Sequence, residues 1–480
     1  MTKTFRKTKI VATLGPASST EEMVGRLLHA GVDIFRLNFS HGDNDQKLEL
    51  IRNIRKASEK WGRPLGILAD LQGPKIRTGK MAGNAMTLSK GQEVVITTDD
   101  ILGSDGVIPT VYRSLPLDVK SGSRILLDDG LLELKVLGIK DERVRCQVVT
   151  GGVLTNNKGI NLPGVHVSAP SLTAKDLIDL DFALDAGVDF VALSFVRMAE
   201  DVDQLKRIIY LRGKNTPVVA KIEKPEALRN FNKILRATDA VMVARGDLGV
   251  EIEAEKVPIY QKKIIQACNQ AGKPVITATQ MLDSMVRNPR PTRAETSDVA
   301  NAIVDGTDAV MLSAETASGD YPVESVETMN RIARDVENAN FWNKNSKSTI
   351  STPSIAQAVA ESACRAAESL NAKAITVFTQ SGSTAALISR FRPRIPILGF
   401  TTSPEIERRL SLYFGVRTVG IGIMEGMDQQ IRKVEEVMIS LGYRKGDIIV
   451  IIMGIPIEAR GSTNLIKVHK LGTGVFFEIY

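Results

Sequence analysis

Short apolar runs recur along the chain, and in its central part they end abruptly on polar residues. A strand buried on both faces reads as a continuous run of Val, Ile, Leu and Met, and parallel strands that alternate with helices place their C-terminal ends on one side of a barrel. The polar ends therefore predict an active site at one rim of a barrel. The five runs are FVALSFVR, VVAKIE, AVMVARGD, VITATQ and AVMLSAET, which end at Arg197, Glu223, Asp247, Gln280 and Thr316.

Extended and helical patterns alternate over much of the chain. Short segments with glycine or polar caps, such as AGVD and AGKP, precede the strands and are typical of helix ends. Right-handed β/α units repeated eight times close into a barrel, so we predict an α/β protein built on a (β/α)8 TIM barrel. The predicted strands are TKIVATLG, DIFRLNFS, PLGILADL, DFVALSFV, PVVAKIE, DAVMVARG, PVITATQ and DAVMLSAE.

After the third strand, short alternating strands such as EVVITT, RILLDD, LLELKVLG and RVRCQVVT interrupt the barrel pattern. Glycine, aspartate and serine separate them, which predicts an inserted β-barrel lid domain over the rim. The polar stretch NKNSKSTISTPS is typical of a linker, and the pattern beyond it predicts a C-terminal α/β regulatory domain. The predicted boundaries are residues 1–70 and 169–344 for barrel domain A, 71–168 for lid domain B and 345–480 for the C-terminal domain.

The composition narrows the class of protein. A chain of 480 residues exceeds the size of a single core, and 43% hydrophobic with 24% charged residues is typical of a soluble globular protein. No apolar run reaches membrane length, and three cysteines without metal-ligand spacing favour a reducing compartment, so we expect a cytoplasmic protein. The net charge is +7, but the basic residues are scattered among 55 acids and aromatics are only 5%, which favours a small anionic substrate over nucleic acid.

Three charged residues lie at neighbouring strand ends. Lys221 and Glu223 are two residues apart on one strand and project to the same side, and Asp247 follows the next strand. Carboxylates of this kind suit Mg²⁺, which usually takes one or two of them and completes its shell with water and substrate. The lysine would stabilise charge that develops on the substrate. A buried ion pair that only joins the two strands is the alternative.

Other polar residues follow the same group of strands. Gly246 lets backbone amides approach an anion without a side chain in the way. Thr279, Ser313 and Glu315 place two hydroxyls and a carboxyl on the next two strand ends. They are either satisfied strand termini or parts of a proton relay.

The segment RLNFSHG lies at the end of the second predicted strand. Arg36, Asn38 and Ser40 occupy alternate positions on one face, and His41 follows them. Oxygens at this spacing would hold a monovalent cation beside a phosphate bound by Arg36. A capped strand end with a surface histidine explains the same pattern.

A set of motifs spans essentially the whole chain: RLNFSHG, DLQGPKIRTG, NNKGINLPG, AKIE, VARGDLGVE, TATQMLDSM and NPRPTRAETSDVANAIVDGTDAVMLSAETASGDYP. Together they resemble the pyruvate kinase family, bacterial type, and the long segment, residues 288–322, is the most specific part of the match. The resemblance implies a barrel, a lid and an effector domain, usually in a homotetramer. It also implies a glycolytic phosphotransferase that converts phosphoenolpyruvate and ADP into pyruvate and ATP with Mg²⁺, or with Mn²⁺ in its place.

The resemblance assigns roles at the barrel rim. Glu223 and Asp247 match the residues that hold Mg²⁺ between the enolpyruvate oxygens and the phosphate. Lys221 would stabilise the transferring phosphoryl group and the enolate, and Arg36 would hold the phosphate of phosphoenolpyruvate. Phosphoryl transfer needs mainly positioning and charge neutralisation from the protein, which is what these residues would supply.

Further matches concern the rest of the substrate. The amides at Gly246 and Asp247 would bind the substrate carboxylate, and Thr279 would lie near the methylene carbon that is protonated. The sequence leaves open whether Thr279 donates that proton or orders a chain of water molecules. Ser313 and Glu315 match positions that would extend such a chain.

The lid also carries matching residues. Arg77 at its hinge and Lys158 within it match residues that contact the nucleotide phosphates. Closure of the lid would bring both cations onto ADP and exclude water. Asp129 would meet the closed site from above.

The GPKIR segment departs from the form in many relatives, which need K⁺ and carry Glu where this chain has Lys75. A fixed ammonium beside the site would replace the bound cation, and Leu71 and Gln72 also fit the K⁺-independent branch of the family. We therefore expect turnover that does not require K⁺. A monovalent-cation pocket would be vestigial, although its oxygens are present on Asn38, Ser40 and Asp70.

In the C-terminal domain, AITVFT, QSGST and TAALISRF predict a strand, a loop and a helix that offer amides and hydroxyls to a phosphate, although an ordinary capped helix has the same pattern. The resemblance favours an allosteric effector loop, which a second segment, RGSTN, would help to close. Ser383 stands where some relatives have a basic residue, so we expect AMP or a sugar monophosphate rather than fructose 1,6-bisphosphate. The effector-binding residues would be Thr379, Ser381, Gly382, Ser383, Thr384 and Ser462.

Two other functions fit parts of the pattern. A Mg²⁺-dependent aldolase acting on pyruvate or phosphoenolpyruvate also uses carboxylates at barrel ends, but it has no need of a lid that carries Arg77 and Lys158. A non-enzymatic anion- or RNA-binding protein is favoured only by the basic charge. It would need clustered basic and aromatic surfaces, which the sequence lacks.

Overall fold

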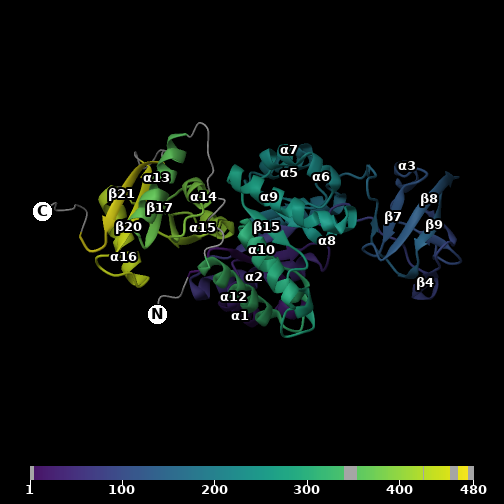
Figure 1. The fold of residues 1–480 in the computed structure, drawn as a ribbon, viewed down its shortest axis with the longest axis horizontal. Helices are drawn as coiled ribbons and strands as arrows, with labels where there is room; N and C mark the ends of the chain where they lie inside the picture. Colours follow the sequence, from purple (N-terminus) through teal and green to yellow (C-terminus); the bar gives the residue numbers. More distant parts are fainter. Residues whose placement is uncertain (1–4, 340–353, 425, 455–462, 474–480) are drawn as a thin grey trace.

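The computed structural model describes residues 5–339, 354–424, 426–454 and 463–473. The barrel lies in the middle, with the lid strands on one side and the C-terminal sheet on the other (Figure 1). The lid and the C-terminal region each pack around apolar cores of their own, and the barrel has one core inside its strands and another between strands and helices. The fold class predicted from the sequence is confirmed.

The barrel is closed and consists of eight parallel strands. They are β1 (Lys9–Leu14), β2 (Ile34–Asn38), β3 (Gly66–Asp70), β12 (Phe190–Leu193), β13 (Val218–Ile222), β14 (Ala240–Ala244), β15 (Val275–Ala278) and β16 (Ala309–Leu312). Their order around the barrel is β1-β16-β15-β14-β13-β12-β3-β2. The apolar runs are continuous because both faces are buried: Val11 packs inside the barrel, whereas Ile10 and Ala12 pack against the helices. All eight predicted strands are present.

Helices cover the outside of the barrel. They are α1 (Glu21–Ala30), α2 (Asn44–Trp61), α4 (Ala174–Asp185), α5 (Ala199–Leu211), α6 (Pro225–Arg229), α7 (Phe231–Ala237), α8 (Arg245–Glu251), α9 (Val257–Ala271), α10 (Arg293–Asp305), α11 (Ala314–Ala317) and α12 (Pro322–Asn338). Thr20 and Thr292 cap helix starts by accepting a hydrogen bond from a backbone amide of the first turn. Gly272 and Gly306 end α9 and α10 in the left-handed conformation, and at Gly272 this is the helix end that the segment AGKP predicts.

The lid is inserted between β3 and β12. It consists of β4 (Ala85–Leu88), β5 (Glu93–Thr97), β6 (Val107–Pro109), α3 (Leu115–Asp118), β7 (Arg124–Leu127), β8 (Leu132–Lys140), β9 (Arg143–Thr150), β10 (Gly152–Thr155) and β11 (Ile160–Asn161). Six strands form a sheet in the order β11-β7-β8-β9-β5-β6, and β10 pairs with β4. In β9, buried and exposed side chains alternate, as expected for a sheet with one face on the core.

The C-terminal region has a five-stranded sheet in the order β19-β18-β17-β20-β21, in which only β21 is antiparallel to its neighbour. Its elements are α13 (Ile355–Ser369), β17 (Ala374–Phe378), α14 (Ser383–Arg390), β18 (Ile397–Thr401), α15 (Pro404–Arg409), β19 (Val416–Gly420), α16 (Met427–Ser440), β20 (Ile448–Gly454) and β21 (Thr463–Lys470). Short 3-10 turns complete the fold: η1 (Pro16–Ser18), η2 (Ala82–Asn84), η3 (Ala254–Lys256), η4 (Asp283–Val286) and η6 (Leu410–Leu412).

The C-terminal region docks on the floor of the barrel, at the N-terminal ends of its strands. Arg392 Nη1 lies 3.1 Å from Asp308 Oδ1, just before β16, and Arg408 Nε lies 2.7 Å from Asp189 Oδ1, just before β12. The rim with the predicted active site is at the opposite ends of the same strands. Among the described helices, none combines the length and the apolar character that a bilayer span requires.

Candidate active site

A buried lysine forms the centre of the charged cluster at the barrel rim. Lys221, near the end of β13, has a side chain 11% exposed, and its Nζ lies 2.9 Å from Glu223 Oε1 and 3.3 Å from Asp70 Oδ1. The same ammonium donates a hydrogen bond of 2.7 Å to Ser194 Oγ. Strand ends that neighbour one another in the barrel therefore bring these residues together, as the rim prediction requires.

Arg36 extends the cluster from β2. Its Nε donates a hydrogen bond of 2.7 Å to Asp70 Oδ2, and its Nη1 donates one of 3.0 Å to Thr13 Oγ1. Both bonds fix the guanidinium plane and leave part of the fork free to bind an anion.

The charged groups of the cluster shift one another's pKa values. Burial would lower the pKa of Lys221, but Asp70 and Glu223 outweigh it and the pKa is raised. Burial opposes ionisation of Asp70, yet Lys221 and Arg36 hold its pKa below the usual value. For Glu223, burial and the nearby charge of Asp247 raise the pKa despite the contact with Lys221. The rim thus holds a stable ammonium beside a carboxylate whose charge that ammonium only partly offsets.

Glu223 and Asp247 have the properties expected of ligands for a divalent ion. Glu223 Oε2 accepts a hydrogen bond of 2.8 Å from the Phe195 amide, whereas Oε1 is buried and has only the Lys221 ammonium, at 2.9 Å, as a polar partner among the described residues. Asp247 is half-buried in the first turn of α8. In the described part of the chain no three acidic, histidine or cysteine side chains gather as a metal cluster. Two carboxylates are sufficient for Mg²⁺, so these residues fit the ion.

The rim also contains strained backbone. Thr279, Gln280 and Phe195 have φ values of 68°, 52° and 55°, a conformation that costs of order 1–3 kcal/mol for such residues and clusters at functional sites. Thr279 Oγ1 accepts a hydrogen bond of 2.7 Å from the Gly246 amide and donates one of 2.6 Å to the carbonyl of Ala278. The β-branched side chain is therefore held in one orientation.

Arg245, which the sequence analysis missed, supports this strained turn. Its Nη2 donates hydrogen bonds to the carbonyls of Thr279, at 2.7 Å, and Gln280, at 3.1 Å. Its Nη1 lies 2.7 Å from Asp298 Oδ2 on α10. The motif ARGDLG contained a signal, since an arginine directly after a buried strand needs partners, but the sequence does not show which carbonyls supply them.

The segment that follows β16 contains Ser313 and Glu315. Glu315 is 2% exposed and accepts hydrogen bonds from the amides of Ser313, at 2.7 Å, and Leu282, at 3.1 Å. Burial raises its pKa. Ser313 Oγ is buried and has no hydrogen-bond partner among the described residues. The carboxyl braces two backbone segments, while the hydroxyl remains available.

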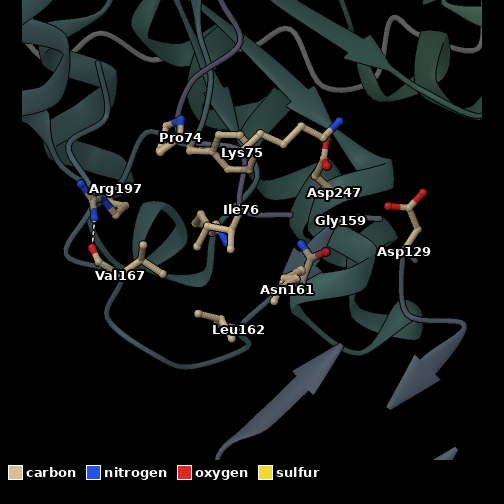
Figure 2. Close-up of a pocket in the computed structure, with 13 residues that line it drawn as sticks. Pro74, Lys75, Ile76, Asp129, Gly159, Asn161, Leu162, Val167, Arg197 and Asp247 are labelled. Atoms are coloured by element: carbon tan, nitrogen blue, oxygen red, sulfur yellow. Dashed lines mark hydrogen bonds between the residues drawn. The ribbon is translucent and has the colours of Figure 1, made fainter. Parts of the chain in front are cut away.

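A pocket lies between the lid and the rim, and residues from the lid, the hinge and the barrel surround it (Figure 2). Asp129 from the lid, Lys75 from the hinge and Asp247 from α8 line the same space. Arg197, where the first apolar run ends, donates hydrogen bonds to the carbonyls of Val167 and Ala169 and so ties the returning hinge segment to the barrel.

The remaining lid and hinge residues differ in their surroundings. Arg77 forms an isolated β-bridge with Gly159, and Lys158 Nζ lies 2.8 Å from Asp128 Oδ1 inside the lid. Burial and the charges of Lys75 and Arg77 lower the pKa of His41, which places these cations near the end of β2. Lys158 is therefore paired within the lid, whereas the cations of the hinge lie close to the rim.

Two of the three residues expected to form the monovalent-cation pocket, Asp70 and Asn38, already use their side-chain oxygens in other contacts. Asp70 is bound to Arg36 and Lys221, and Asn38 Oδ1 accepts a hydrogen bond of 3.1 Å from the Ser40 amide.

The expected effector loop lies in the C-terminal region, away from the barrel rim (Figure 1). Thr379 Oγ1 accepts a hydrogen bond of 2.9 Å from the Gly382 amide, and Gly382, with φ 85°, precedes α14. The hydroxyls of Ser381 and Ser383 are 3.0 Å apart, and that of Thr384 lies 2.8 Å from Thr463 Oγ1 in β21. Ser462 lies outside the described residues.

The apolar run that ends at Arg197 is longer than its strand. β12 ends at Leu193, because Phe195 turns the chain at positive φ and presents its amide to Glu223. Ser194, the partner of Lys221, was also missed by sequence reasoning. The only signal for it was the single serine within the run FVALSFV.

Comparisons with known proteins agree with this geometry. A family model described as pyruvate kinase, barrel domain, matches residues 5–326, and one described as pyruvate kinase, alpha/beta domain, matches residues 357–469. A pyruvate kinase of Mycobacterium intracellulare is 48% identical over 470 residues, which cover 97% of this chain and 99% of the relative. One of Geobacillus stearothermophilus is 46% identical over 474 residues, which cover 97% and 80%.

The crystal structure of a pyruvate kinase from Cryptosporidium parvum is similar to the present structure with a TM-score of 0.91 and 39% sequence identity. The similarity covers 97% of this chain and 96% of that one. Family models, relatives and fold all agree, and the chain therefore belongs to the pyruvate kinase family of phosphotransferases.

Proposed function

We propose that the protein transfers the phosphoryl group of phosphoenolpyruvate to ADP and so makes pyruvate and ATP, as a glycolytic enzyme of the cytoplasm. One observation carries the proposal. Lys221, Arg36 and their acidic neighbours converge at the barrel rim, where the buried Oε1 of Glu223 has only the Lys221 ammonium as a polar partner among the described residues. Such a cluster suits a highly charged substrate that binds together with a divalent ion.

The charged residues have complementary roles in this proposal. Glu223 and Asp247 would hold Mg²⁺, or Mn²⁺ in its place, and the bound ion supplies positive charge to the phosphate and enolate oxygens. Lys221 would stabilise the phosphoryl group in transit and the enolate, since its acidic neighbours keep it protonated despite burial. Arg36 would bind the phosphate of phosphoenolpyruvate, because Asp70 already fixes its guanidinium plane.

The substrate carboxylate would bind at the start of α8, on the amides of Gly246 and Asp247. The hydroxyl of Thr279 donates its hydrogen to a backbone carbonyl and accepts from the Gly246 amide, which favours a role in ordering water over direct donation of a proton. The buried hydroxyl of Ser313 and the carboxyl of Glu315 would continue this chain toward the methylene carbon.

The lid would complete the nucleotide site. Arg77 and Lys158 would contact the phosphates of ADP when the lid closes, and Lys158 would then exchange Asp128 for the nucleotide. Asp129 lines the pocket from the lid side and would face the closed site. Closure would also exclude water that competes with ADP for the phosphoryl group.

We also propose that turnover does not require K⁺. Lys75 lines the pocket together with Asp247, and burial together with the charge of Lys75 lowers the pKa of His41, just beyond β2, so this lysine would supply positive charge there. Asp70 is occupied by Arg36 and Lys221, so the oxygens of Asn38 and Ser40 would form only a vestigial cation pocket.

A phosphorylated effector would activate the enzyme from the C-terminal region of a homotetramer. The loop before α14 offers amides, hydroxyls and a helix start, and it contains no basic side chain, which favours AMP or a sugar monophosphate. The binding residues would be Thr379, Ser381, Gly382, Ser383 and Thr384.

Coupled detection of pyruvate tests the proposed reaction. We expect pyruvate only when phosphoenolpyruvate, ADP and Mg²⁺ are all present, with equal amounts of ATP formed. Pyruvate formed without ADP would indicate another enzyme of phosphoenolpyruvate, and binding of the anions without turnover would indicate a binding protein.

A further inference from the structure

One buried carboxylate joins the lid to the barrel. Glu251 ends α8, and its side chain is 1% exposed. Its Oε1 accepts a hydrogen bond of 3.0 Å from Asn161 Nδ2, at the tip of β11 in the lid, and one of 2.5 Å from Lys224 Nζ. A single oxygen thus connects the lid, α8 and the segment that follows β13.

Each of these segments leads directly to the rim. Asp247 lies one turn before Glu251 on α8, and Lys224 is the residue after Glu223. Asn161 lines the same pocket as Asp247 (Figure 2). Lys224 also lines this pocket. Movement of the lid tip would therefore act on the two elements that present the proposed metal-binding carboxylates.

Two other parts of the lid lie near the same end of α8. A Cβ atom on Gly130, in the turn between β7 and β8, would lie 3.7 Å from Val250 Cγ1. The charges of Arg124 in β7 and Glu253, just beyond α8, attract one another. The lid thus approaches the C-terminal end of α8 and the residues just beyond it, with Glu251 as the buried polar contact.

Lys224 is the second partner of Glu251 in the contact between the lid and α8. Its side chain is 14% exposed and its ammonium lies 5.5 Å from the centre of the Phe195 ring, the residue whose amide holds Glu223. Since a buried charge without its partner is costly, we expect Lys224 to remain paired with Glu251 when the lid undocks. Asn161 is the partner that lid movement adds or removes.

We propose that Glu251 is a positioning residue that couples docking of the lid to the alignment of the two metal-binding carboxylates. The inference rests on the proposed function, in which Glu223 and Asp247 hold the divalent ion. With the lid docked, Asn161 and Lys224 hold α8 and the segment after β13 in one arrangement. Coupling of this kind is reciprocal, so the bound ion also favours the docked lid.

The test measures Mn²⁺ binding to the full chain without substrates, by the electron spin resonance signal of free Mn²⁺. Asn161→Ala and Glu251→Ala are compared with two exposed controls, Gln147→Ala on the lid and Glu255→Gln beyond α8. Residues that orient metal ligands typically change metal affinity about 10–100-fold. We expect Glu251→Ala to weaken Mn²⁺ binding by about 10-fold or more and Asn161→Ala to weaken it less, with both controls unchanged.

Three further readouts separate positioning from simple support of the fold. Asn161→Ala is expected to raise KM for ADP more than it lowers kcat, with little change in melting temperature. In the double variant, Asn161→Ala should add nothing to Glu251→Ala, because the contact is already lost. Glu251→Gln, which keeps an acceptor oxygen, should restore most of the Mn²⁺ affinity.

Mn²⁺ affinity and KM of Asn161→Ala equal to those of Gln147→Ala would overturn the inference, as would additive effects in the double variant. Glu223→Gln separates this failure from a failure of the proposed function. If Glu223→Gln loses Mn²⁺ while Asn161→Ala and Glu251→Ala bind it normally, only the coupling is wrong. If Glu223→Gln also binds Mn²⁺ normally, the assigned metal site is wrong.

Discussion

The two ends of the barrel each contain a carboxylate with a side chain 1% exposed, Glu223 at the rim and Asp189 at the floor. Asp189 is fully satisfied. Its Oδ2 accepts hydrogen bonds from Arg55 Nη2 and the Ile67 amide, both at 2.9 Å, and its Oδ1 accepts one from Arg408 Nε at 2.7 Å. The protein supplies everything that this buried charge needs, so its role is to join the floor of the barrel to the C-terminal region.

Glu223 is not satisfied in the same way. Its Oε1 has the ammonium of Lys221 at 2.9 Å as its one polar partner among the described residues, and burial together with Asp247 raises its pKa. The charge of Glu223 is therefore only partly balanced by the protein, because Lys221 is shared with Asp70. Burial alone does not distinguish a functional carboxylate from a structural one, whereas the balance of donors around it does.

The largest effect is expected at the rim lysine. Lys221→Ala removes the charge that stabilises the transferring group, so kcat should fall about 10³-fold while the protein stays folded. Coupled pyruvate detection and circular dichroism measure both properties, with Lys233→Ala, an exposed lysine of α7, as the control. Full turnover by a folded Lys221→Ala enzyme would remove the assigned role.

Glu223→Gln tests the partly balanced carboxylate directly. We expect kcat/KM for phosphoenolpyruvate to fall about 100-fold, because the ion loses a charged ligand. Stability toward urea should stay the same or rise, since the raised pKa shows that the folded protein disfavours this charge. A clear loss of stability at unchanged activity would assign Glu223 to the framework instead.

Asp189→Ala should give the opposite result. Its loss leaves Arg55 and Arg408 without their buried partner, which typically costs about 3 kcal/mol or more in the free energy of unfolding. The molecules that remain folded should keep the wild-type kcat. Urea unfolding and kinetics below the transition provide the measurement, and a fall in kcat with no change in the unfolding midpoint would contradict the comparison.

Substitution of an exposed charged residue near the rim should change turnover less than substitution of a buried one. Lys75→Glu reverses the charge that we propose stands in for K⁺. An interaction near a protein surface of about 1–4 kcal/mol corresponds to a change in activity of about 5-fold or more. The wild type should turn over in K⁺-free buffer, and the variant should require K⁺ for full activity. Strong K⁺ stimulation of the wild type would show that Lys75 does not replace the cation.

The effector loop has no charge, so the smallest effect is expected there. Ser381→Ala removes one hydroxyl, and a single hydrogen bond contributes about 1 kcal/mol. The concentration of AMP or sugar monophosphate that gives half-activation should rise about 5-fold. An activation curve identical to that of the wild type would exclude Ser381 from the effector site.

The sequence predicts the barrel well because its strands are buried on both faces and read as unbroken apolar runs. It also places Lys221 and Glu223 together, because residues two apart on a strand share a face. The contacts of Ser194 and Arg245 could not be predicted, since they depend on which carbonyls and hydroxyls neighbouring strands present after closure. The positive φ of Phe195 likewise depends on tertiary packing and leaves no mark in the apolar run.

The most direct test is a crystal structure of the enzyme with Mn²⁺ and phosphoenolpyruvate, with the ion located by its anomalous signal. We predict a peak coordinated by Glu223 and Asp247, with the phosphate of the substrate between Lys221 and Arg36. A peak at any other place, with these carboxylates turned away from the ion, would contradict the account.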